Sequence, residues 1–141
     1  MGDRIKRIAV CMYDDSLDIF FKMLNDTGRY HVLTIPPESQ GGAVGLCKES
    51  GADILLLGVS LGEGFRVDDR LELIETVREA LPGCKVILYT ETAMSARDTR
   101  SVKLLYSMRA VDDVVYSDCG QEYLLLKLDT IQPLREIAEL L

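Results

Sequence analysis

The feature that most constrains the fold is an uninterrupted apolar run, residues 54–57, inside the stretch 53–64. Four large aliphatic side chains in succession are too few to span a membrane. They suit the central strand of a parallel sheet, which is buried on both faces. The run ends at Gly58 and leads into a glycine-rich loop. Because α/β proteins place ligand-handling groups in the loops after strand ends, the surroundings of Gly58 are the first candidate site.

Strand-like and helix-like segments alternate along the rest of the chain. The helices at 16–26 and 70–81 carry apolar residues at helical spacing, and the helix at 41–51 is weakened by three glycines. Short loops between such units predict right-handed βα repeats on a parallel sheet. Five units fit an α/β, flavodoxin-like doubly wound fold with strand order 2-1-3-4-5 and helices on both faces. The expected strands are 7–13, 30–35, the start of 53–64, 85–90 and 111–116; the other expected helices are 95–108 and 120–141.

Two helices have apolar stripes that predict which face is buried. The stripe of the first helix is capped by Ser16, and that of the third ends at Pro82 and Gly83. The predicted buried residues are Leu17, Phe20, Phe21 and Leu24 in the first helix, and Leu71, Ile74, Val77 and Leu81 in the third.

The composition is that of an acidic globular domain with a net charge of −7. Nucleic-acid binding by this segment is not expected, because it depends on clustered Lys and Arg. The four cysteines, with a single His31, lack the spacing of a zinc or haem site, so reduced and mostly buried thiols are expected. No signal peptide, myristoylation motif or membrane span is recognisable, which predicts a cytoplasmic location. The cysteines are Cys11, Cys47, Cys84 and Cys119.

Five segments, in their order and spacing, resemble the receiver domain of bacterial response regulators. They are the acidic pair Asp14 and Asp15 and the stretches ADILLLGVSLGEG, LELIETVREALPG, KVILYTET and AVDDVVYSD. The resemblance covers about residues 5–130. It implies phosphoryl transfer from a histidine kinase to an Asp at the end of the third strand, with Mg²⁺ on the acidic pair. A hydroxyl residue and a Lys would contact the phosphoryl group, and an aromatic switch residue would alter the surface around the fourth helix.

Only some of these roles fall on matching residues in this sequence. Asp14 and Asp15 match the acidic pair, although a shift by one residue is open, and Thr90 matches the hydroxyl. The acceptor Asp falls on Gly58, the Lys on Ser117 and the Pro after that Lys on Asp118. The switch aromatic falls on Val114, with Tyr116 nearby, and the Pro usual in the loop after the acceptor falls on Gly62.

These losses predict a degenerate receiver that takes no phosphoryl group. Without the acceptor carboxylate the site lacks its nucleophile, and loss of the Lys at the same time avoids an uncompensated buried charge. Asp14 and Asp15 are candidates for weak Mg²⁺ binding, or else act as caps and turn formers. Glu63, Asp68 and Asp69 are interpreted as solvated loop acids. Whether the place beside Gly58 is an empty pocket or a closed one is left open.

The function predicted is phosphorylation-independent regulation by protein contact, without catalysis, through homodimerisation or control of an output domain such as a DNA-binding module beyond the C-terminus. The receiver-like domain is placed at 1–132 and a helical extension or linker at 133–141, with Pro133 between them. An apolar stripe near the C-terminus predicts a partner surface, or folds back on the domain's own core. The candidate interaction residues are Val114, Tyr116, Leu128, Ile131, Leu134 and Ile137.

Two other hypotheses stay open. A small-ligand module of the same fold would bind flavin or cobalamin. The loop at Asp14 and Asp15 would repel a flavin phosphate, and His31 does not lie in the loop where a cobalamin-ligating His is expected. A functional phosphoreceiver in a shifted register would place Leu57 or Val59 at the acceptor position, and neither can accept a phosphoryl group.

Overall fold

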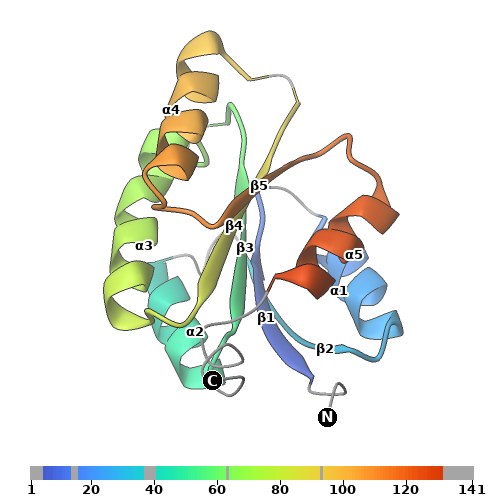
Figure 1. The fold of residues 1–141 in the computed structure, drawn as a ribbon. Helices are drawn as coiled ribbons and strands as arrows, with labels where there is room; N and C mark the ends of the chain where they lie inside the picture. Colours follow the sequence, from blue (N-terminus) through green and yellow to red (C-terminus); the bar gives the residue numbers. More distant parts are fainter. Residues whose placement is uncertain (1–4, 14–15, 37–40, 63, 93, 132–141) are drawn as a thin grey trace.

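Strands and helices alternate along the chain in the computed structural model, which describes residues 5–13, 16–36, 41–62, 64–92 and 94–131. Their arrangement is shown in Figure 1. The strands are β1 (Lys6–Cys11), β2 (Tyr30–Ile35), β3 (Ile54–Val59), β4 (Lys85–Thr90) and β5 (Asp113–Tyr116). The helices are α1 (Leu17–Asp26), α2 (Ala43–Ser50), α3 (Val67–Ala80), α4 (Ala96–Ser107) and α5 (Gln121–Thr130).

The five strands form one parallel sheet in the order β2-β1-β3-β4-β5, which confirms the predicted fold. Every residue of β3 is buried, as its continuous apolar run predicted. Helices α2, α3 and α4 cover one face and α1 and α5 the other (Figure 1). Successive residues of β3 enter opposite cores: Leu55 and Leu57 pack toward α2–α4, and Ile54 and Leu56 toward α1 and α5.

Some predicted element ends were wrong. β1 ends at Cys11 rather than at residue 13, and β5 begins at Asp113 rather than at residue 111. Helix α3 begins at Val67, three residues earlier than predicted, so Asp68 and Asp69 lie in its first turn instead of in a loop. Carboxylates at a helix N-terminus are stabilised by the helix dipole, and a carboxylate oxygen of Asp69 accepts a hydrogen bond from the Arg66 amide at 3.1 Å.

The buried stripe of α3 also differs from the prediction. Ile74 and Val77 are buried as expected, whereas Leu71 and Leu81 are only half-buried. The remaining buried positions are Val67 and Arg70. A stripe chosen by hydrophobicity misses a buried arginine, because helical spacing defines the buried face but not the chemistry of each position on it. In α1, Phe20 and Leu24 are buried, but Phe21 is exposed.

The cysteines are free, and three of them are buried. Burial raises the pKa of Cys47 to about 11 and that of Cys84 to about 12, so both remain thiols at neutral pH. In the part of the chain that the structure describes, no helix is long and apolar enough to cross a membrane.

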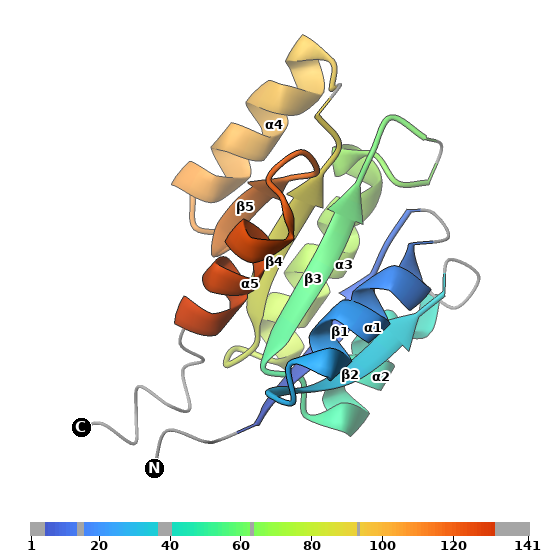
Figure 2. The ribbon, with the colours of Figure 1, turned by 90° about the vertical axis from the view of Figure 1, so that its right-hand side faces the viewer.

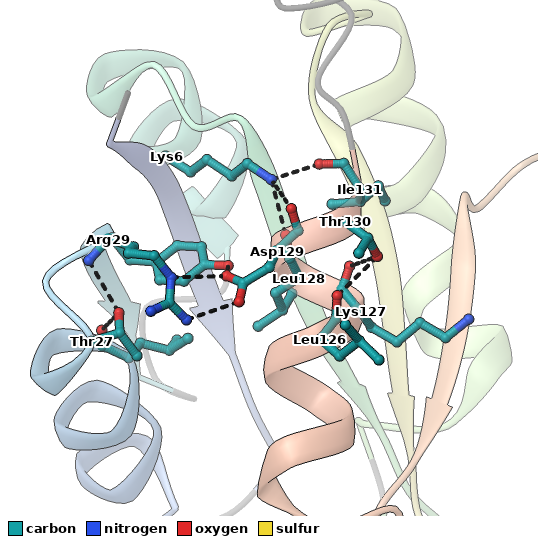
Figure 3. Close-up of polar contacts among 11 residues, drawn as sticks. Lys6, Thr27, Arg29, Leu126, Lys127, Leu128, Asp129, Thr130 and Ile131 are labelled. Atoms are coloured by element: carbon teal, nitrogen blue, oxygen red, sulfur yellow. Dashed lines mark hydrogen bonds and ion pairs between the residues drawn. The ribbon is translucent and has the colours of Figure 1, made fainter. Parts of the chain in front are cut away.

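The C-terminal end of α5 is attached to the amino ends of β1 and β2 (Figure 3). The Lys6 ammonium donates hydrogen bonds to three carbonyl oxygens that the helix leaves unpaired, those of Leu128 (3.1 Å), Asp129 (2.9 Å) and Ile131 (2.7 Å). A cation at this end also complements the helix dipole. Lys6 therefore caps a helix that begins more than a hundred residues later in the chain.

Asp129 completes this attachment. Its carboxylate accepts hydrogen bonds from the Arg29 guanidinium at 2.8 and 3.3 Å and from the Tyr30 hydroxyl. Burial by itself would raise the pKa of Asp129, but the hydrogen bonds from Tyr30 and Arg29 and the charges of Arg29 and Lys6 outweigh it and lower the pKa. The ionised form of Asp129 is thus stabilised in the folded protein.

We predict that Asp129→Asn removes a pH-dependent part of the stability. Because the folded-state pKa lies below the unfolded value, this part is fully present above about pH 4–5 and is lost as the pH falls through the folded pKa. Urea titrations of the free energy of unfolding should show the variant less stable by about 0.5–1 kcal/mol at pH 7, since a third-exposed carboxylate is screened, and the difference should shrink below pH 4. Asp118→Asn, in the exposed turn after β5, is the matched control and should show no such trend. A difference that stays constant from pH 7 to pH 3 would contradict the assignment.

Candidate functional site

The carboxyl ends of the parallel strands meet at one edge of the sheet, at the top of Figure 2. Gly58 lies next to the end of β3, opposite Tyr89 of β4. Thr90 ends β4, and Ser117 directly follows β5, with its amide donating to the Thr90 carbonyl at 2.8 Å. Three of the five predicted pocket residues are therefore together at this edge. The other two, Asp14 and Asp15, lie outside the described residues.

The place beside Gly58 is closed rather than empty. A Cβ atom built on Gly58 would lie 2.8 Å from Tyr13 Cδ1, 3.0 Å from Met12 Sδ and 3.1 Å from Met12 Cα. Contacts of this length are repulsive, and the Met12 Cα belongs to a backbone that cannot rotate away. A glycine within a buried strand often marks such a close approach. Met12 and Tyr13 thus occupy the space into which a side chain at position 58 would extend.

The side chains around this contact are apolar and aromatic. Met12 is fully buried in the core under α1 and α5, and Tyr89 packs against the same core. The rings of Phe20 and Tyr89 meet edge to face at 5.2 Å, a favourable aromatic geometry. An ionised carboxylate at position 58 would have to be desolvated among these groups, and burying an unpaired charge is costly.

The hydroxyl groups of the edge already have partners within the chain. Thr90 is fully buried, and its hydroxyl donates to the Val115 carbonyl at 3.4 Å. The Ser117 hydroxyl lies 3.1 Å from that of Thr92 and accepts from the Thr92 amide at 3.2 Å. These bonds join β4, β5 and the loop after β4, so both hydroxyls serve to hold the edge together.

A buried cation, which the sequence did not predict, lies under the same strand end. Arg70 is only 3% exposed, and its Nε donates to the Gly58 carbonyl at 3.0 Å. Its guanidinium also lies 3.9 Å from the Cys11 sulfur and 5.1 Å from the centre of the Phe65 ring. The hydrogen bond and the cation–π contact fix Arg70 between α3, β3 and the loop that joins them.

Burial lowers the pKa of Arg70 and raises that of Cys11. The charge and hydrogen bond of Arg70 act in the opposite direction on Cys11, but burial outweighs them. A guanidinium stays protonated in proteins, so the pair is a cation beside a neutral thiol. Arg70 reaches this strand end from the α3 side of the sheet, where its Nε donates to the backbone carbonyl of Gly58.

The acids interpreted as solvated loop groups have structural roles. Asp68 pairs with Arg97 of α4 at 3.3 Å, and Asp69 accepts from the amide of Arg66, the N-cap of its own helix. Glu63 lies outside the described residues. Among the described residues, no group of three or more His, Cys, Asp or Glu side chains is placed to hold a metal ion. Mg²⁺ binding by Asp14 and Asp15 stays a prediction, without a third carboxylate from position 58.

The candidate interaction residues have four different outcomes. Leu128 was wrongly predicted to face a partner: it is fully buried under the sheet, because α5 turns this side toward β1 and β3. Val114 and Ile131 are half-buried against the two cores, whereas Tyr116 is 38% exposed at the end of the edge strand β5. Leu134 and Ile137 lie outside the described residues, as does the extension at 133–141.

Sequence reasoning missed Met12, Tyr13 and Arg70. The glycine at the end of an otherwise aliphatic strand was the available signal for a close approach, but it does not say which residues approach. For Arg70, the signal was its spacing of four and seven residues from Ile74 and Val77. That spacing places a guanidinium on the buried face of α3.

The fold class defined by this topology is the flavodoxin-like doubly wound sheet, and solved structures of this class match the chain. A CheY-like response regulator receiver domain from Methanospirillum hungatei JF-1 has 20% identity and a TM-score of 0.64, covering 88% of this chain and 90% of that one. The chemotaxis protein CheY4 of Vibrio cholerae has 17% identity and a TM-score of 0.66, covering 92% and 99%. A LuxR-family DNA-binding response regulator from Staphylococcus aureus has 15% identity and a TM-score of 0.68, covering 89% and 100%.

No protein-family model matches the chain, and no curated protein matches it. At identities of 20% or less, the likeness to these structures shows the fold: a receiver-type arrangement of five strands and five helices. The chemistry of the site depends on the residues of this chain.

We predict that Gly58→Ala destabilises the protein by about 1–3 kcal/mol, the usual cost of forcing extra atoms into a packed core. The physical reason is the 3.1 Å approach of a Cβ to the Met12 backbone. Gly45→Ala is the matched control, because a Cβ there meets nothing within 4 Å and replacing a helical glycine stabilises by about 0.5–1 kcal/mol. Urea denaturation of both variants measures the two effects, and a neutral Gly58→Ala would show that Met12 and Tyr13 yield.

Proposed function

We propose that this chain is a receiver-like regulatory domain that works without phosphorylation and acts by contact with other proteins. The proposal combines the receiver-type fold with an altered phosphorylation site. It is a binding module rather than an enzyme. It would act in signal transduction, either by forming a homodimer or by controlling an output domain such as a DNA-binding module.

The observation that carries the proposal is the contact of Met12 and Tyr13 with Gly58. The acceptor position has no side chain, and the space for one is filled. A phosphoryl group would need a carboxylate nucleophile, a cation to balance its charge and room for its oxygen atoms. At this edge the corresponding positions hold a glycine and Ser117, so nucleophile and cation are absent together.

The hydroxyl positions support the same conclusion. Signalling in receivers, as the resemblance implies it, requires a hydroxyl that moves toward the phosphoryl group. In this chain the Thr90 hydroxyl is buried and bonded to the Val115 carbonyl, and Ser117 is bonded to Thr92. These hydrogen bonds form without a phosphoryl group. They therefore support a single, fixed conformation at the carboxyl ends of β4 and β5.

Exposed apolar side chains near β5 support a role in protein contact. Tyr116 at the end of β5 and Tyr123 and Leu126 of α5 are all solvent-exposed. β5 is an edge strand, so these residues border a part of the sheet that no further strand of the described chain covers. Large apolar groups gathered at such a place are typical of interaction sites.

Solved structures of the same fold indicate the kinds of output that such a domain accompanies. One is a LuxR-family DNA-binding response regulator, and another is the signal receiver domain of a modulated diguanylate cyclase from Desulfovibrio desulfuricans G20. For the present chain, the sequence around the C-terminal stripe, including Ile131, Leu134 and Ile137, is the proposed connection to an output module.

We predict that incubation with acetyl phosphate and Mg²⁺ adds no phosphoryl group to the protein. Intact-mass spectrometry measures this, with a phosphorylatable receiver domain as the positive control under the same conditions. The physical reason is the missing nucleophile at position 58. A stoichiometric adduct that is stable in acid and labile in base would contradict the proposal. Loss of that adduct in Asp14→Ala or Asp15→Ala would then identify its acceptor.

A further inference from the structure

Helices α3 and α4 lie side by side on one face of the sheet and carry opposite charge (Figure 1). Helix α3 has five carboxylates and two guanidinium groups, of which Arg70 is buried and Arg78 is paired with Asp112. Helix α4 has three cations and one carboxylate, Asp98, which is buried and paired with Arg66. The solvent-facing side of α3 is therefore acidic and that of α4 basic, in a chain whose net charge is −7.

The exposed acids of α3 form a continuous stripe. They follow one another at intervals of four, three and four residues, so they lie on one side of the helix. All of them are exposed to solvent. The stripe consists of Asp68, Glu72, Glu75 and Glu79.

Helix α4 and its C-cap carry a stripe of the same spacing, formed by Arg97, Ser101 and Leu104 of the helix and by the C-cap residue Met108. The ion pair between Arg97 and Asp68, 3.3 Å long, shows that this side of α4 borders α3. Leu104 is nonetheless 57% exposed and Met108 68% exposed, so α3 does not cover them. Two large apolar side chains thus lie in solvent between the acidic stripe and the exposed cations Arg100 and Lys103.

These two stripes, with Arg100 and Lys103, constitute what is called here the α3–α4 face. We propose that a second copy of this chain docks on the α3–α4 face, with α4 of each copy against α3 of the other. The inference rests on the proposed function in that it names the partner of a contact module. A two-fold axis between the helices exchanges their positions, so a single rotation brings each acidic stripe onto a basic helix. The contact is self-complementary and closed.

The apolar residues and the charges have different roles in this dimer. Exposed ion pairs contribute little affinity individually, so Leu104 and Met108 supply most of it by leaving water. The charges determine orientation, because any pairing that places α3 on α3 sets carboxylates against one another. Two copies with a net charge of −7 each repel at long range, so only the orientation with local complementarity is attractive.

The α3–α4 face is held rigid before any partner arrives. At one end of α4, Arg66 of the α3 N-terminus pairs with Asp98 at 3.0 Å. At the other end, the Arg78 guanidinium donates to the Ala110 carbonyl at 2.8 Å and to Asp112 at 2.8 Å. Arg109, in the turn between the end of α4 and Ala110, is the one non-glycine residue of the described chain with positive φ, 60°. Because α3 fixes both ends of α4, docking requires little ordering of this surface.

A charge exchange between the two helices tests the proposal. One variant carries Glu75→Lys and Glu79→Lys on α3, and the other carries Arg100→Glu and Lys103→Glu on α4. Sedimentation velocity over a concentration series of the full chain should show a concentration-dependent wild-type dimer. Each variant alone should dimerise at least about tenfold more weakly, because both of its contacts become like-charged. An equimolar mixture should recover a heterodimer of near wild-type affinity, since both of its contacts are again opposite in charge.

Two exposed aliphatic residues on opposite faces of the sheet locate the contact. Leu104→Glu on α4 should abolish dimerisation, whereas Ile19→Glu on α1, where the side chain is 71% exposed, should leave it unchanged. The reverse result would place the dimer on the α1 side and overturn the inference. A monomeric wild type, or a mixture that fails to recover the dimer, would also overturn it. Either failure leaves the proposed function standing as long as acetyl phosphate adds no phosphoryl group to the protein. A phosphoryl adduct would overturn the proposed function but would not affect the inference of the dimer.

Discussion

The contact of Met12 and Tyr13 with Gly58 is the constraint on which the carboxyl edge of the sheet depends. It brings the two residues after β1 so close to β3 that a Cβ at position 58 would lie 2.8–3.1 Å from their atoms. The space in which a receiver would place its acceptor carboxylate is thereby given to a thioether and an aromatic ring. Met12 and Tyr13 fill the space beside Gly58, so this contact joins the segment after β1 to the end of β3.

The polar groups near Gly58 form hydrogen bonds with other parts of the same chain. The Thr90 and Ser117 hydroxyls are bonded to neighbours in the sheet, and Arg70 supplies a cation that binds the Gly58 carbonyl from the α3 side. Gly58 and Ser117 carry no charge, so neither position buries a charge that would need a partner. The Nε of Arg70 donates to the Gly58 carbonyl and its guanidinium lies over the Phe65 ring, so these contacts join α3 to β3 and the loop between them.

Away from Gly58, charged side chains fix two other parts of the molecule. At the amino ends of the strands, Lys6 and Asp129 attach α5 to β1 and β2 (Figure 3). Gly58 lies near the opposite, carboxyl end of β3. On one side, α3 holds α4 at both ends and exposes opposite charges with two apolar residues between them. In a receiver the fourth helix would respond to phosphorylation. In this chain its position follows from arginines of α3.

The sequence by itself determined the sheet and its order, because strand and helix periodicities are local and the aliphatic run at 54–57 had to be central. It also determined that Gly58 has no side chain to accept a phosphoryl group and that Ser117 supplies no cation, since both follow from the residue types alone. Only the tertiary structure decided that the place beside Gly58 is closed, that Arg70 is buried and that Leu128 belongs to the core while Leu126 does not. Those outcomes depend on which side chains from distant segments approach each position, and periodicity along one element carries no information about its neighbours in space.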